Sequence, residues 1–120
     1  MNELFFFRHY MTELEDPALS AFFRRYKAKG YGFYWYFLER LYSEPTNTMV
    51  HSRALLKELG QALGLRPRKV KEMLVALEDL GLIVLDHRYR ISSDRVKKEV
   101  KEVMAIRARN KRRRENEIEI

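Results

Sequence analysis

Basic side chains gather where a helix is predicted to begin in the middle of the chain. Pro67 is typical of the first position of a helix, and its neighbours include Arg66, Arg68, Lys69 and Lys71. Glu78 and Asp79 lie at the opposite end of the same predicted helix. Both groups oppose the helix dipole, by about 0.3–1 kcal/mol for each exposed charge. A bound phosphate would offset this cost, because basic side chains and open helix amides both attract anions.

The same helix start lacks a capping residue. Arg66 occupies the position where Ser, Thr, Asp or Asn is preferred, and the missing cap costs about 1 kcal/mol. A sequence selected for stability alone would not choose this arrangement. We therefore interpret the helix start as a site for the phosphates and base edges of a nucleic acid. The alternative interpretation is an ordinary, solvated helix end.

A second basic group lies in a predicted hairpin. Residues 88–91 alternate in polarity, which predicts a strand with Tyr89 and Ile91 facing inward. Arg88 and Arg90 would then face outward, where they can contact phosphates or a minor groove. Arg53, at the start of another predicted helix, can also reach the nucleic-acid backbone. Ordinary surface charge is the alternative for these arginines.

The C-terminal part of the chain carries the densest run of positive charge. This basic tail comprises Arg107, Arg109, Lys111, Arg112, Arg113 and Arg114, with no acidic residue between them. Such a run is typical of a solvated tail that strengthens nucleic-acid binding without sequence preference. The whole chain has a formal net charge of +7, and the surplus lies after residue 51. This distribution favours a polyanionic partner.

No pattern in the sequence is typical of catalysis or of a metal site. His9, His51 and His87 are far apart, cysteine is absent, and there is no glycine-rich phosphate loop. We therefore expect no catalytic residue, no cofactor and no metal ligand. The absence of cysteine suits a reducing cytoplasm. No apolar run reaches the roughly 20 residues that a membrane helix needs.

Two helices are predicted to precede these sites. Asp16 is a good N-cap and Pro17 suits the first helical position, so the first helix begins there and ends at Gly30. A second helix, residues 32–42, is apolar nearly all round because residues 33–38 are aromatic or leucine. Such a helix belongs in a core. The alternative is a stacking platform for single-stranded bases, which would leave an aggregation-prone surface.

A helix, a tight turn and a second helix are predicted next. Ser52 caps a helix of residues 53–63, and residues 64–66 form the turn. The helix that begins at Pro67 ends at Gly81. Its buried stripe is predicted to comprise Val70, Leu74, Leu77 and Leu80.

Short strands flank this pair of helices. Residues 48–50, 82–85 and 88–91 are the predicted strands, and Asp86-His87 is the predicted turn of the hairpin. A long last helix is predicted from near Ser93 or Asp94 to about Arg114. Its stripe of Val96, Val100 and Val103 predicts packing on the domain or on a second copy of the chain.

This order of elements predicts the fold class. It is mainly α with a small β-hairpin wing, a winged helix-turn-helix followed by a long C-terminal helix. Residues 1–95 are predicted to form the winged-helix domain, and residues 96–120 a basic helix or tail.

The aromatic segment also resembles a known family. Residues 30–42, Gly-Tyr-Gly-Phe-Tyr-Trp-Tyr-Phe-Leu-Glu-Arg-Leu-Tyr, resemble the Gly-Tyr-Gly-x-Tyr-Trp signature of phage and prophage replisome-organiser proteins of the DnaD type, in their N-terminal winged-helix domains. Phe7-x-His9 is similar to the opening motif of the family. Asp16-Pro17 sits where its first helix begins, and residues 91–95, Ile-Ser-Ser-Asp-Arg, are similar to its segment after the wing.

The resemblance implies an origin-binding replication initiator. Its partners would be double-stranded DNA and other replication proteins, in the cytoplasm of a bacterial host. Tyr10 stands where the family usually shows an acid, and these 120 residues contain no counterpart of its acidic helicase-contacting domain. DNA binding therefore carries over better than helicase loading.

Two other functions are compatible with the predicted fold. A transcriptional repressor would bind DNA as a homodimer, paired through the last helix. A protein-interaction adaptor would dock a partner on the wing or the aromatic surface and would have no affinity for DNA.

Overall fold

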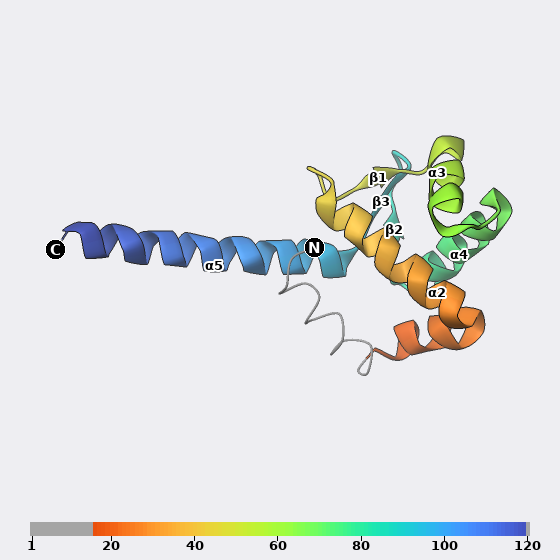
Figure 1. The fold of residues 1–120 in the computed structure, drawn as a ribbon, viewed down its shortest axis with the longest axis horizontal. Coiled ribbons are helices and arrows are strands. Elements are labelled where there is room, and N and C mark those ends of the chain that lie inside the picture. Colours follow the sequence, from red (N-terminus) through yellow and green to blue (C-terminus); the bar gives the residue numbers. More distant parts are fainter. Residues whose placement is uncertain (1–15, 120) are drawn as a thin grey trace.

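The structure is a computed structural model that describes residues 16–119. Phe7, His9 and Tyr10, which the family resemblance uses, lie outside the described residues. Figure 1 shows the earlier helices and a small sheet gathered into one body, from which the last helix projects. Within residues 16–119, no helix is long and apolar enough to cross a membrane.

The first described helix is α2, Pro17–Ser43, and it bends sharply. Its start is as predicted, because the Asp16 carboxylate accepts hydrogen bonds from the amides of Ala18 (2.9 Å) and Leu19 (3.3 Å). The predicted end at Gly30 is wrong. The helix instead breaks at Lys27, which has φ 59° and ψ −140°, and resumes through Gly30.

Packing explains the position of this break. Gly30 is buried, and a Cβ atom there would lie 2.5 Å from the Cβ of Tyr26 and 3.3 Å from the ring of Phe22. The chain turns at Lys27 so that the two halves of α2 press together at Gly30. The glycine therefore permits a close approach of two helical segments and does not act as a helix stop.

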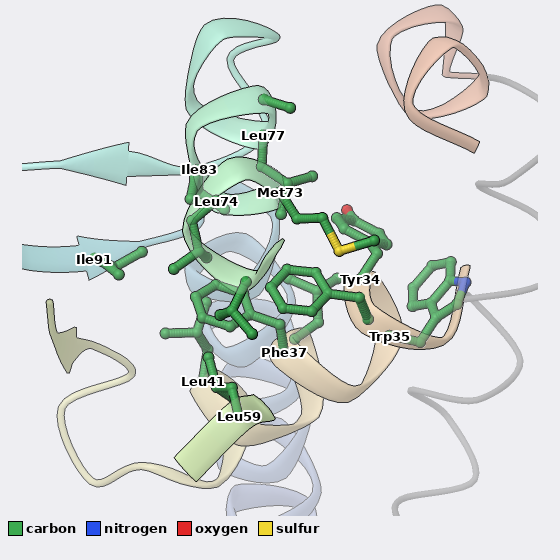
Figure 2. Close-up of a cluster of buried hydrophobic side chains, with 14 of the residues drawn as sticks. Tyr34, Trp35, Phe37, Leu41, Leu59, Met73, Leu74, Leu77, Ile83 and Ile91 are labelled. Carbon is green, nitrogen blue, oxygen red and sulfur yellow. The ribbon is translucent and has the colours of Figure 1, made fainter. Parts of the chain in front are cut away.

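The second half of α2 forms the centre of the core. Five of its side chains are almost completely buried: Phe33, Tyr34, Phe37, Leu38 and Leu41. Figure 2 shows Phe37 and Leu41 pointing toward side chains of the following helices, such as Met73 and Leu59. The interpretation as core is confirmed, and this run does not form an exposed platform for bases.

Helices α3, Arg53–Leu63, and α4, Pro67–Asp79, form the predicted helix-turn-helix. The Ser52 hydroxyl caps α3 by accepting from the amide of Leu55 (3.1 Å), and Gly64 ends it with φ 68°. Gly60 makes the turn tight, because its carbonyl accepts from the Leu65 amide (2.8 Å) and a Cβ there would meet the Leu65 carbonyl oxygen.

One residue of the predicted stripe on α4 is not buried. Val70, Leu74 and Leu77 lie in the core, whereas Leu80 is 36% exposed. Leu80 is the C-cap residue of α4. The helical repeat no longer sets the direction of its side chain once the chain leaves the helix for Gly81, whose φ is 75°.

Three short strands form an antiparallel sheet in the order β1-β3-β2. They are β1, Met49–Val50, β2, Val84–Leu85, and β3, Arg90–Ser92. In the central strand, Ile91 pairs with Met49 on one side and with Leu85 on the other. Because opposite residues share a face of a sheet, all three point toward the core, where Met49 and Ile91 are buried.

The hairpin turn is longer than the predicted Asp86-His87 pair. Asp86 bonds through its amide to the Arg90 carbonyl (3.0 Å), so the loop spans residues 87–89. Tyr89 lies in this loop with φ 58° and is 66% exposed. The prediction that Tyr89 belongs to a strand and faces inward is wrong. The Asp86 carboxylate stabilises the turn by accepting hydrogen bonds from backbone amides, and the alternation of polar and apolar residues does not predict these bonds.

The last helix is α5, Asp94–Glu119, which extends beyond the predicted end at Arg114. Its first turns pack on the body, with Val96 fully buried and Val100 and Val103 partly buried. The element order and sheet topology confirm the predicted fold class, a winged helix-turn-helix with a long C-terminal helix.

Candidate nucleic-acid interface

The start of α4 has the open geometry that the sequence predicts. Arg66 is the N-cap residue, and its side chain makes no capping hydrogen bond. The Arg66 carbonyl accepts from the amides of Lys69 (2.9 Å) and Val70 (3.1 Å). The side chains of Arg66, Arg68 and Lys71 are exposed to solvent around this helix end.

Lys69 differs from the other basic residues of this group. Its ammonium group pairs with the Glu72 carboxylate at 2.9 Å and lies 5.1 Å from the ring centre of Tyr26. The hydrogen bond from Lys69 is the main reason that the pKa of Glu72 is lowered, and Tyr26 contributes next. Burial, followed by the nearby Glu72 carboxylate, raises the pKa of Tyr26. Lys69 therefore links α4 to the first half of α2.

One face of α4 borders an open depression. Its lining includes Arg68, Lys71 and Val75, which share one side of the helix, and Arg25 from α2. Arg25 was not among the predicted site residues. Its place beside α4 depends on the bend at Lys27, for which the sequence has no signal. The helical pattern of the first helix shows only that Arg25 is exposed.

Hydrogen bonds fix the backbone of the hairpin loop, called the wing below (residues 86–90). The Asp86 carboxylate accepts from the amides of Arg88 (2.8 Å) and Arg90 (3.0 Å). Both bonds lower the pKa of Asp86, and the bond from the Arg90 amide has the larger effect. The side chains of Arg88 and Arg90 are both exposed, and the Arg90 guanidinium donates to the Thr48 hydroxyl (3.2 Å).

The wing and the start of α3 meet in space. Arg90, Thr48 and Ser52 line one depression, although Ser52 is distant from Arg90 in the sequence. Arg53 follows Ser52 directly and is exposed. The fold therefore brings Arg90 close to Ser52, the residue that precedes Arg53. This depression and the one beside α4 share no lining residue.

The basic tail lies on the projecting part of α5. All six of its residues are exposed, and the helix leaves the body at about Met104, which is 61% exposed. Arg107 and Arg114 follow Val100 at intervals of one heptad, so they continue the face with which α5 packs on the body. The structure does not bring the basic tail together with the start of α4.

Among the described residues, no group of three or more His, Cys, Asp or Glu side chains is placed to hold a metal ion. His51 is half-buried and follows β1, whereas His87 is exposed in the wing.

The element order, the tight turn between α3 and α4 and the three-stranded sheet define the class of winged helix-turn-helix folds. Comparison of the chain with protein-family models, with curated proteins and with solved structures finds no match. The structure shows the fold class, and membership of the replisome-organiser family stays a prediction from the motifs.

Proposed function

We propose that this protein binds double-stranded DNA, with the start of α4 in the major groove and the wing and the start of α3 on flanking phosphates. The observation that carries this proposal is the uncapped, basic start of α4. In a helix-turn-helix the second helix is the one that enters the groove, and its N-terminal residues meet the base edges.

Energetics support this use of the helix start. The missing cap costs about 1 kcal/mol, and cations near the positive end of a helix dipole cost about 0.3–1 kcal/mol each. Arg66, Arg68 and Lys71 are nevertheless exposed there, without the carboxylate that holds Lys69. A DNA phosphate at this end would offset both costs, because it would accept hydrogen bonds from the open amides and pair with the cations.

The remaining predicted residues fit contacts outside the groove. Arg53 at the start of α3 and Arg88 in the wing are exposed arginines, a residue type that commonly contacts phosphates. Arg90 lies nearby, directed toward β1 by its bond to Thr48. The basic tail on α5 would add affinity that does not depend on sequence, through release of counterions from the DNA.

The finer role that the motifs support is the DNA-binding domain of a phage-type replication initiator. This role rests on the resemblance of residues 30–42 and 91–95 to the replisome-organiser family. A repressor that dimerises through α5 is less favoured by the charges. Past Val103, the face that would form the seam continues with Arg107 and Arg114, and like charges in a seam repel.

A salt titration tests the proposal. The full chain would be titrated into a fluorescein-labelled duplex, and the anisotropy would be measured from about 50 to 200 mM salt. We expect binding that weakens steeply as salt increases, because cations on the protein displace the counterions of DNA. Absence of binding at the lowest salt would overturn the proposal and favour the adaptor.

A further inference from the structure

The most exposed large aromatic side chain of the described residues lies in the wing. Tyr89 is 66% exposed, whereas the aromatic run in the second half of α2 lies in the core. Tyr89 belongs neither to the hydrophobic core nor to the partly buried side chains that pack against it. An exposed aromatic side chain on a surface loop is a common feature of a binding site.

The backbone of Tyr89 is also unusual. Its φ of 58° lies in the left-handed region, which glycine and asparagine adopt at lower cost than tyrosine. The Tyr89 amide donates to the Asp86 carbonyl (3.1 Å), and its carbonyl accepts from the His51 amide (2.7 Å). Hydrogen bonds thus hold the residue on both sides. The turn therefore holds a tyrosine in a backbone conformation that costs free energy, while its ring lies largely exposed. This combination favours a functional explanation for Tyr89 over a structural one.

The charges around this ring indicate its partner. His87, Arg88 and Arg90 are all exposed in the wing, and the wing contains no carboxylate other than the turn-forming Asp86. An aromatic ring between arginines suits a nucleic-acid strand, whose bases stack on the ring while its phosphates pair with the cations. In a continuous duplex the faces of the bases are covered by their neighbours. An unpaired base offers a free face.

From these observations we infer that Tyr89 stacks on an unpaired base beside the duplex that α4 holds. The protein would therefore prefer a duplex with an adjoining single-stranded segment over a continuous duplex. This inference rests on the proposed function, because α4 must place the wing beside the DNA. It adds a specificity for DNA in which a duplex adjoins a single strand, and one residue of the wing, Tyr89, provides that specificity.

Two duplex probes of the same sequence test this inference. One is blunt, and the other continues into a short single strand with 2-aminopurine as its first unpaired base. Anisotropy gives the Kd for each probe, and 2-aminopurine fluorescence reports stacking of that base. We expect the wild-type chain to bind the extended probe about fivefold or more tightly, because each stacked base contributes at least that much. We also expect it to quench the fluorescence.

Matched variants at Tyr89 separate the ring from the backbone. Tyr89→Asn removes the ring but suits the left-handed conformation, and Tyr89→Phe keeps the ring. We expect Tyr89→Asn to lose both the preference and the quenching while its Kd for the blunt probe stays within about twofold. We expect Tyr89→Phe to keep both. The Kd for the blunt probe should change little, because that probe has no unpaired base on which the ring can stack.

The possible failures are distinct. Equal binding of the two probes by the wild-type chain, with salt-dependent duplex binding intact, overturns the inference about Tyr89 and leaves the proposed function standing. The inference is also overturned if Tyr89→Asn weakens both probes equally, because the ring would then act on paired DNA. If neither probe binds, both proposals are wrong.

Discussion

The guanidinium group of Arg95 lies 4.7 Å from the ring centre of Trp35. Trp35 belongs to the aromatic motif of residues 30–42, and Arg95 ends the motif of residues 91–95, so the fold brings the two motifs together. Arg95 also pairs with Glu99 at 3.3 Å, and both side chains are largely buried. This contact between Arg95 and Trp35 joins the start of α5 to the core helix.

Replacement of Arg95 should destabilise the fold. Arg95→Ala removes the partner of the buried Glu99 carboxylate, and loss of one member of a buried pair costs about 3 kcal/mol. Urea unfolding followed by the fluorescence of Trp35, the single tryptophan of the chain, measures this loss. Lys97→Ala is the matched control, because Lys97 is exposed on the same turn of α5. Equal stability of the two variants would contradict the anchoring role of Arg95.

Replacement of Tyr89 should have the opposite effect on stability. Tyr89→Asn relieves the left-handed strain, and we expect the free energy of unfolding to rise by about 0.5–1 kcal/mol. Tyr89→Phe should leave it unchanged. Thermal unfolding of the three proteins measures the difference. A lower stability of Tyr89→Asn would mean that the ring packs on the body, and the functional explanation of Tyr89 would lose its support.

Gly60 and Gly32 should respond differently to alanine. Gly60→Ala places a Cβ against the Leu65 carbonyl oxygen in the helix-turn-helix turn, so it should cost about 1–3 kcal/mol. Gly32 has open space around it, and Gly32→Ala should stabilise α2 by up to about 1 kcal/mol. Urea unfolding compares the two variants. A neutral Gly60→Ala would show that the turn is looser than the structure indicates.

The wing should loosen in acid. The amides of Arg90 and Arg88 lower the pKa of Asp86 below its ordinary 3.8, because they bind its charged form. The stabilisation is therefore complete above the ordinary pKa and disappears as the pH falls through the lowered value. An NMR titration should show the Asp86 carboxyl protonating below 3.8, together with shifts of the two amides. Protonation at or above that value would contradict the turn geometry.

Much of the fold could be predicted because local signals and packing agree. Ser52, Pro67 and Gly81 each mark a helix boundary that the structure has at the expected place. The aromatic run beginning at Phe33 is in the core because a helix that is apolar all round has no face for solvent. Ile91 is buried as the alternation around it predicts.

The errors lie where one distant or side-chain contact outweighs the local pattern. Lys27 has no helix-breaking character, and its left-handed φ comes from the contact of Gly30 with Tyr26. Tyr89 fits the strand pattern, but the Asp86 carboxylate binds two amides and draws the residue into the turn. Arg25 joins the α4 face only because of the bend at Lys27.

The most direct test of the central claim compares the salt dependence of duplex binding for two double variants. Arg68→Ala/Lys71→Ala removes two cations from the start of α4, and Lys97→Ala/Lys98→Ala removes two exposed cations from α5. For the first variant we expect weaker binding, unchanged or higher thermal stability, and a slope of log K against log salt that is smaller by about 1.8, or about 0.9 for each lost phosphate contact. For the second variant we expect a slope close to that of the wild type. Equal affinity and slope for the α4 variant and the wild type would contradict the account.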